Sequence, residues 1–250
     1  ERLNQSYEGV EFELASAIRR LTLKEHKRIG ILVGHTKVPP PRFSDLLATL
    51  QQNYDLYFDV QNPDSWEKGD LLIIPKPDLP FTEDEKYRLD QFVMRGGKLV
   101  LFADGARVDS VSLEGTFAQP SALNLDDLLF KYGCRINQNL VKDLSCALLP
   151  LNVGNMGDKP QIKPMPWRFF PLINNFGKHP IVRNLDAIYT RFPSSIDTVD
   201  APGIVKTPLL LTSQYTKLLK APALVAYNEA RQQPDPREYN AGVKNVALLL

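Results

Sequence analysis

Two uninterrupted apolar runs of strand length, at residues 71–74 and 99–102, stand out along the chain. Such runs are typical of strands covered on both faces, as in a parallel sheet. Between them, Thr82 and Glu85 form the T-x-x-E capping box of a helix start, and Gly96 with the next glycine supplies a C-terminal stop. The segment therefore predicts a right-handed unit of strand, helix and strand.

The same alternation of strands and helices extends towards the N-terminus. Residues 7–23 carry apolar positions at helical spacing, which predicts an amphipathic helix. Residues 28–34 and 56–60 have the pattern of strands, and residues 44–53 have the pattern of a helix between them. Four strands are therefore predicted to share one parallel-rich sheet.

The pattern leads to a division of the chain into three parts. We expect an N-terminal amphipathic helix within residues 1–27 and an α/β core at residues 28–137, in which Asn124 caps a helix that ends at Gly133. The predicted fold class is α/β, with an open, mostly parallel, flavodoxin-like sheet covered by helices on both faces.

Residues 138–250 have a different sequence pattern, because prolines and glycines divide them into short segments that are predicted to be extended. Residues 141–151 and 162–173 are predicted to pair across a loop at 152–161. Further strand candidates lie at 188–192, 208–212, 223–227 and 245–250. We expect this part to hold β-rich additions and strands that return to the main sheet, as part of the same domain.

Composition limits the function classes. The 250 residues are 43% hydrophobic, which allows a full core, and 30 basic residues against 29 acidic ones argue against a nucleic-acid binder. No run approaches about 18 apolar residues, the length of a membrane span. The sequence starts at Glu1 without Met and stops inside an apolar run. We therefore expect a soluble portion of a longer protein whose membrane helices lie outside this sequence.

The two cysteines, Cys134 and Cys146, are too few for a disulfide scaffold or a zinc site of about four ligands. A single bridge and two independent thiols both remain open. No cofactor is indicated.

Candidate ligand-binding residues follow the predicted strand ends, where doubly wound sheets bind ligands. This mixed polar set can hold an anion or a carbohydrate; alternatively, its members are loop residues that face water. The candidates are His35, Thr36, Lys76, Asp78, Asp104 and Arg107.

Specific catalytic machinery is not indicated. The loop after the first strand is not G-x-G-x-x-G, there is no P-loop, and the turn after residue 102 offers neither Ser nor Cys as a nucleophile. His35 is the single histidine at a plausible site, and it has no evident triad partners. His35, Asp78 and Asp104 are the candidate ligands for a metal cation, but we expect no metal site there. We predict that the chain is not an enzyme.

The order of several phrases carries a family resemblance. The phrases are GDLLIIPKPDLPFTEDEKYRLDQFVMRGGKLVLFADG, LDDLLFKYGCRINQNLVKDLSC, PMPWRFFPLI, HPIVRNLDAI and RFPSSIDTV. Together they resemble the extracytoplasmic domain of gliding-motility-associated ABC-transporter auxiliary proteins of Bacteroidetes, the GldG-like family.

The resemblance implies a class I glutamine-amidotransferase-like fold, also found in an intraflagellar-transport protein. It implies a periplasmic domain at the inner membrane, tethered by helices outside this chain, beside a permease and an ATPase. The amidotransferase nucleophile elbow would carry Cys, whereas this chain has Asp104-Gly105 there. The expected function is non-catalytic binding of a partner subunit or a solute. The alternatives are a hydrolase or amidotransferase-like enzyme at the strand-end rim, and a purely structural domain of a motility or export complex.

A proline-stiffened aromatic segment is the predicted partner surface. It contains Trp167, Arg168, Phe169 and Phe170, and Trp and Arg are over-represented among residues that dominate interface energies. The hypothesis is that at least one ring is exposed and contacts the permease or a second copy of the domain. The alternative is that the rings pack in the core of the chain.

Overall fold

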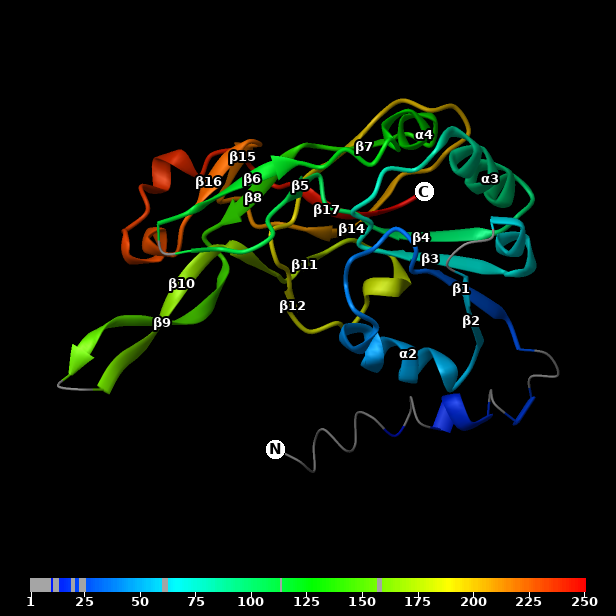
Figure 1. Cartoon of the computed structure of the whole chain (residues 1–250), viewed down its shortest axis with the longest axis horizontal. Coiled ribbons are helices and arrows are strands. Elements are labelled where there is room, and N and C mark those ends of the chain that lie inside the picture. Colours follow the sequence, from blue (N-terminus) through cyan, green and yellow to red (C-terminus); the bar gives the residue numbers. More distant parts are fainter. Residues whose placement is uncertain are drawn as a thin grey trace. The chain divides into compact units, whose positions relative to one another are not determined.

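The computed structural model describes residues 10, 14–18, 21–22, 26–59, 63–112, 114–156 and 159–250. The chain divides into two compact units, Glu1–Ala103 and Asp104–Leu250 (Figure 1). Of the predicted helix at residues 7–23, residues 10, 14–18 and 21–22 are helical, and the others lie outside the described residues.

The first unit contains one parallel sheet. Its strands lie in the order β2-β1-β3-β4 and are β1 (Arg28–Leu32), β2 (Asp55–Asp59), β3 (Leu71–Pro75) and β4 (Lys98–Phe102). The connecting elements are η1 (Pro40–Phe43), α2 (Ser44–Gln51), η2 (Pro63–Lys68) and α3 (Glu83–Met94). The prediction that these four strands share a parallel sheet is confirmed.

Helix α3 begins where the capping box predicts. The hydroxyl of Thr82 accepts a hydrogen bond from the backbone N–H of Glu85, and the Glu85 carboxylate accepts one from the Thr82 N–H. Leu89 and Phe92 bury one face of the helix. Gly96, with φ of 94°, provides the left-handed residue that ends it. Local sequence signals therefore determine this helix from start to end.

The second unit is built from four small antiparallel sheets. Their orders are β12-β10-β9, β11-β14-β17-β13-β7, β15-β8 and β16-β6-β5. The strands are β5 (Ala106–Arg107), β6 (Thr116–Pro120), β7 (Cys134–Ile136), β8 (Asn139–Asp143), β9 (Cys146–Met156), β10 (Lys159–Ile173), β11 (Asn175–Phe176), β12 (Ile188–Tyr189), β13 (Ile196–Thr198), β14 (Thr207–Leu211), β15 (Thr216–Lys220), β16 (Ala223–Val225) and β17 (Asn245–Leu249). The helical elements are α4 (Asp126–Lys131), η3 (Pro180–Val182), η4 (Tyr227–Arg231) and η5 (Pro236–Glu238).

The predicted fold class, an open and mostly parallel α/β sheet with helices on both faces, is wrong for this chain. In the described part of the chain one sheet is parallel and four are antiparallel. A parallel connection needs a crossover of a dozen or more residues, usually a helix, and α4 has 6 residues. Among the described residues after 103, no helix is long enough for such a crossover, and the strands there pair antiparallel.

Other boundaries also differ from the sequence expectations. The expected division at residue 137 falls inside the second unit, because β7 pairs with β13. The N-cap position of α4 is Leu125, one residue after the predicted Asn124, which adopts a φ of 59°. The expected loop at 152–161 is largely strand, so β9 and β10 form a much longer hairpin than predicted.

Candidate functional site

The strand-end rim of the first unit joins two of its loops by hydrogen bonds. The backbone carbonyl of His35 accepts from the N–H groups of Asp78 and Leu79 at 2.7 and 3.2 Å. The Asp78 carboxylate accepts from the N–H of Lys37 at 3.2 Å. His35 and Asp78 therefore lie in neighbouring loops, and their polar groups hold the two loops to each other.

His35 forms a dyad that the sequence did not reveal. Its Nε2 lies 3.0 Å from Oε1 of Glu85, and its ring stacks on buried Phe81 with centroids 3.9 Å apart. Burial raises the pKa of the Glu85 carboxyl, but hydrogen bonds from Thr82 and the proximity of His35 outweigh it and lower the pKa overall. The ring atom Nδ1 is buried without a hydrogen-bond partner among the described residues. The capping glutamate thus has a second role, which a capping pattern alone could not show.

The remaining rim candidates have contacts and conformations of their own. The Thr36 hydroxyl accepts from the N–H of Val38, and Lys76 is exposed with a positive φ of 46°. Asp104 and Arg107 belong to the second unit, where Arg107 forms an ion pair with Asp109 at 3.2 Å. Within the described residues, no group of three or more His, Cys, Asp or Glu side chains could hold a metal ion.

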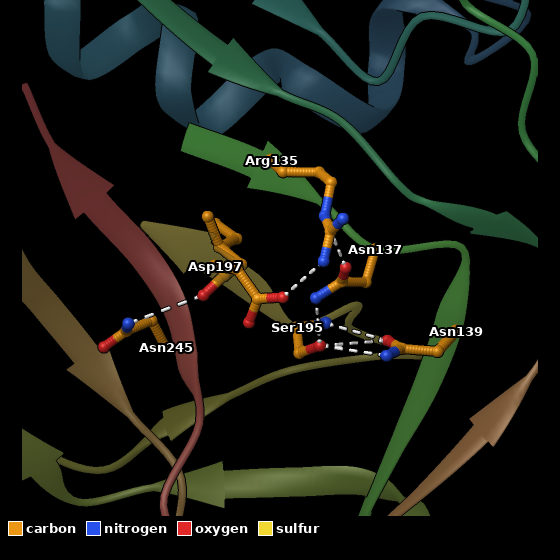
Figure 2. Close-up of polar contacts among 7 residues, drawn as sticks. Arg135, Asn137, Asn139, Ser195, Asp197 and Asn245 are labelled. Atoms are coloured by element: carbon orange, nitrogen blue, oxygen red, sulfur yellow. Dashed lines mark hydrogen bonds and ion pairs between the residues drawn. The ribbon is translucent and has the colours of Figure 1, made fainter. Parts of the chain in front are cut away.

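A polar network in the second unit links the turn between β7 and β8 to the segment that leads into β13 (Figure 2). Arg135 donates to the Asp197 carboxylate at 3.0 Å and to the side-chain oxygen of Asn137 at 3.1 Å. The amides of Asn137 and Asn139 both donate to the hydroxyl of Ser195, at 3.0 and 2.9 Å. Asn245 on β17 donates to the backbone of the same segment at 3.4 Å.

This network has the chemistry of a structural tie. Amide groups are not bases, so they cannot activate the hydroxyl of Ser195 as a nucleophile. The hydrogen bond from Asn137, and then Arg135, lower the pKa of the Asp197 carboxyl although burial opposes them. Gly105 passes so close that a Cβ would collide with the carbonyl oxygen of Asn137, and its N–H donates to Ser194 at 2.9 Å. The glycine of the predicted ligand loop is therefore needed for close packing.

A buried cationic pair lies under the segment that contains η4. The side chains of Lys142 and Arg168 belong to residues that are each 5% exposed. Lys142 is ion-paired with Glu229 and lies 4.9 Å from the centroid of the Phe169 ring. Arg168 donates to the backbone carbonyls of Glu229 and Gln232 at 3.1 and 2.6 Å. Burial, with Lys217 and Arg168 nearby, lowers the pKa of Lys142 to about 8.

The aromatic segment predicted as a partner surface lies in the core. Trp167, Phe169 and Phe170 are 1%, 0% and 3% exposed, so the expectation of an exposed ring is wrong. The Trp167 ring packs against Phe169 at 5.2 Å and against Tyr227 at 5.3 Å, measured between centroids. These rings remain buried because β9, β12 and η4 pack around this half of β10. Arg168 is buried for the same reason.

Both cysteines are free. Burial raises the pKa of each thiol. The question that the sequence left open is thus answered in favour of two independent thiols.

The comparisons with known proteins give a family match and a structural likeness. No curated protein matches the chain. Among solved structures, the mmIFT52 N-terminal domain is similar to it, with a TM-score of 0.52 and 17% identity over 78% of this chain and 77% of that chain. This likeness concerns the fold alone, and the fold is the mixed arrangement described above rather than the predicted open sheet.

In the part of the chain that the structure describes, no helix is both long and apolar enough to cross a membrane. The family match extends over residues 26–250 and therefore over most of the chain. The chain belongs to the ABC-transport auxiliary family described as "ABC-type uncharacterized transport system".

Proposed function

We propose that this chain is a non-catalytic component of an ABC-type transport system and acts by binding a partner subunit. The partners are the membrane-embedded permease and the ATPase. The sequence resemblance supports the gliding-motility type of such systems, with the domain on the periplasmic side of the inner membrane and tethered by helices outside this chain.

The observation that carries the proposal is that the polar side chains of the candidate sites bond to one another. His35 contacts Glu85, Asp78 holds the backbone of Lys37, and the hydroxyl of Ser195 lies between two amides. A solute site or a catalytic site instead needs several polar groups that converge on the ligand. Polar groups that are paired within the chain therefore favour recognition of a protein.

A solute at the strand-end rim is the second candidate. It is favoured by the buried Nδ1 of His35, because an unpaired buried polar atom costs free energy unless a ligand or water satisfies it. Lys76 and Asp78 would supply further polar contacts. A solute that stabilises the wild-type chain but not the His35→Phe variant in thermal unfolding would support this candidate.

Recovery of the full-length protein from membranes tests the main proposal. The tagged protein is purified in mild detergent, and its companions are identified by mass spectrometry, beside an unrelated tagged membrane protein as the control. We expect the permease and the ATPase of one ABC system in a fixed ratio. Their absence would contradict the proposal. Turnover of ester, amide or glutamine substrates that disappears on His35→Ala or Asp104→Ala would favour the enzymatic alternative.

A further inference from the structure

The outer part of the β9–β10 hairpin has two faces that differ in what covers them. The hairpin extends away from the rest of the second unit (Figure 1). Pro150 pairs with Pro164, and Leu149 pairs with Met165. Because directly opposed residues in an antiparallel pair share a face, side chains alternate between the two faces along both strands.

One face packs on the core and the other faces solvent. Leu149, Leu151 and Met165 are partly buried against the core cluster around Trp167. The opposite face is fully exposed, and Leu148 and Ile162 on it are 61% and 62% exposed. We call it the solvent face of the hairpin. Its residues are Leu148, Pro150, Asn152, Ile162, Pro164 and Pro166.

The solvent face is apolar and carries no charge, with Asn152 as its single polar residue. Exposed apolar patches are common as scattered single residues, but a contiguous one marks an interaction site. Depletion of charge at the centre is also the compositional mark of protein–protein interfaces. The composition of the face therefore fits the centre of an interface.

The prolines determine how a partner can approach. Neither Pro150 nor Pro164 has an N–H to donate to the other strand, so this position is a non-hydrogen-bonded pair and its backbone nitrogens face the outer edges. An additional strand would find no donor there. Strand addition is therefore disfavoured at this position, and the side chains of the solvent face offer the alternative contact. Because proline stiffens the hairpin, it loses less entropy on binding than a flexible loop would.

The surroundings of the solvent face are basic. Lys159 and Lys163 are exposed on β10, Lys163 on the opposite face because it pairs with Leu151, and no acidic residue occurs among the described residues of β9 or β10. Arg231, also exposed, donates to the backbone carbonyl of Asn152 at 2.7 Å and brings a third positive charge to the hairpin. A partner with acidic residues around an apolar centre would be complementary in charge.

A second copy of the chain does not fit this face well. With about 3.4 Å per residue and about 4.8 Å between strands, five residues on each of two strands offer at most a few hundred Å². A stable interface buries about 800 Å² on each partner. Two flat hairpins placed face to face would fall short, whereas a groove that encloses the hairpin would also cover its edges.

We propose that the solvent face of the hairpin inserts into a groove on the permease of the transport system, with an apolar floor and an acidic rim. This inference rests on the proposed function and adds the surface and the chemistry of the contact. The permease is the occupant because the family is described as an ABC-type transport system, in which the proposed function makes the permease a partner, and because a copy of the chain is too flat a partner.

The test compares matched substitutions in the full-length protein purified from membranes. Leu148→Glu and Ile162→Glu each place a carboxylate on the solvent face. Val205→Glu is the control, because Val205 is a 78% exposed apolar residue of the same unit away from the hairpin. We expect both hairpin variants to recover about tenfold less permease or worse, as for other central interface residues, while Val205→Glu recovers wild-type amounts. Thermal unfolding should be unchanged in all three.

The basic residues of the hairpin, which would face the acidic rim of the groove, are tested in the same experiment. Lys159→Glu combined with Lys163→Glu should reduce permease recovery at low salt, and the difference from wild type should shrink as salt is raised. Unchanged recovery with both lysines reversed would overturn the acidic rim.

Each other outcome is also decisive. If the wild-type protein and the hairpin variants recover the permease equally, the hairpin inference is wrong and the proposed function stands. If the wild-type protein recovers no permease, the proposed function fails and the hairpin inference fails with it. A dimer of the 250-residue chain in sedimentation that Ile162→Glu dissociates would make a second copy the occupant. Binding to anionic phospholipid vesicles that Ile162→Glu abolishes would make it a membrane surface. Both would overturn the proposal.

Discussion

Strand β10 contains two halves with opposite environments. In its inner half, residues 167–170 are at most 5% exposed, whereas most residues of the outer half, 159–166, are exposed. Both halves are rich in apolar residues and proline. Apolar content alone therefore does not mark an interface; an apolar residue is available to a partner only where no other element covers the face on which it lies.

The number of neighbours explains the difference. The inner half lies between β9 and β12, and β8 and η4 pack on it. The outer half has β9 as its sheet neighbour, and one of its faces lies on the core. Apolar side chains on its other face gain nothing from folding, which makes them available to a partner.

The largest expected effect is on the inner half. Phe169→Ala removes a fully buried ring that contacts Trp167 and Lys142, and the cavity left behind should lower the free energy of unfolding by about 3–5 kcal/mol. Urea denaturation at constant pH measures it, with Phe117→Ala, at a 60% exposed ring, as the control. A loss below about 1 kcal/mol would mean that the inner half is not core.

Replacement of Arg168 should have the next largest effect on the free energy of unfolding. Arg168→Met keeps much of the apolar stem but leaves the carbonyls of Glu229 and Gln232 without their donor, and an unsatisfied buried group costs about 1–3 kcal/mol. Arg168→Lys should not restore the loss, because one ammonium cannot reproduce the planar guanidinium that spans two carbonyls. Full rescue by lysine in urea denaturation would show that charge, and not geometry, matters here.

The lowered pKa of Lys142 predicts that the free energy of unfolding depends on pH. This pKa falls from 10.5 to about 8 on folding, so below pH 8 both states are protonated and the cost of the buried charge is fully present. Between pH 8 and 10.5 the unfolded chain binds more protons at this site, so the contribution of Lys142 to stability rises with pH, by about 1 kcal/mol from pH 7.5 to 9. Burial raises the pKa of Tyr239 from 10.0 to about 12 although Arg168 opposes it, so the contribution of that side chain to stability falls mainly as the pH rises above 10.

Lys142→Met is the matched control for this pH effect, because it keeps Cys146, Tyr239, Glu238 and the other groups that titrate nearby. The rise in stability between pH 7.5 and 9 should be smaller by about 1 kcal/mol in this variant than in the wild type. Equal slopes in urea denaturation for the two proteins would contradict a lowered pKa at Lys142.

The smallest effect belongs to the outer half. Ile162→Ser replaces a side chain that is 62% exposed, so the free energy of unfolding should change by less than about 0.5 kcal/mol. Urea denaturation of Ile162→Ser and Phe169→Ala under the same conditions compares the outer and inner halves of β10 directly. A loss comparable to that of Phe169→Ala would show that the solvent face is covered by the chain itself.

The sequence predicted those parts that local signals determine. The strands of the parallel sheet follow from continuous apolar runs, and α3 follows from its capping box and its glycines. Both kinds of signal act within a few residues, so no tertiary information is needed to find them.

The sequence patterns did not predict the features that depend on tertiary packing. The pattern of β10 does not show that β12 and η4 cover its inner half, so the sequence alone predicts a partner surface at Trp167 and Phe170. The contact between His35 and Glu85 joins residues 50 positions apart. The solvent face of the hairpin became visible only with the register of β9 and β10, because a shift of one residue would exchange its two faces.

Site-specific crosslinking in the membrane tests the central claim most directly, that the outer half of the hairpin is a binding surface. A photoreactive amino acid is placed at position 162 in the full-length protein, and at position 205 as the exposed control. We predict a crosslink from position 162 to the permease and none from position 205. Crosslinks to the permease from position 205 with none from position 162 would contradict the account.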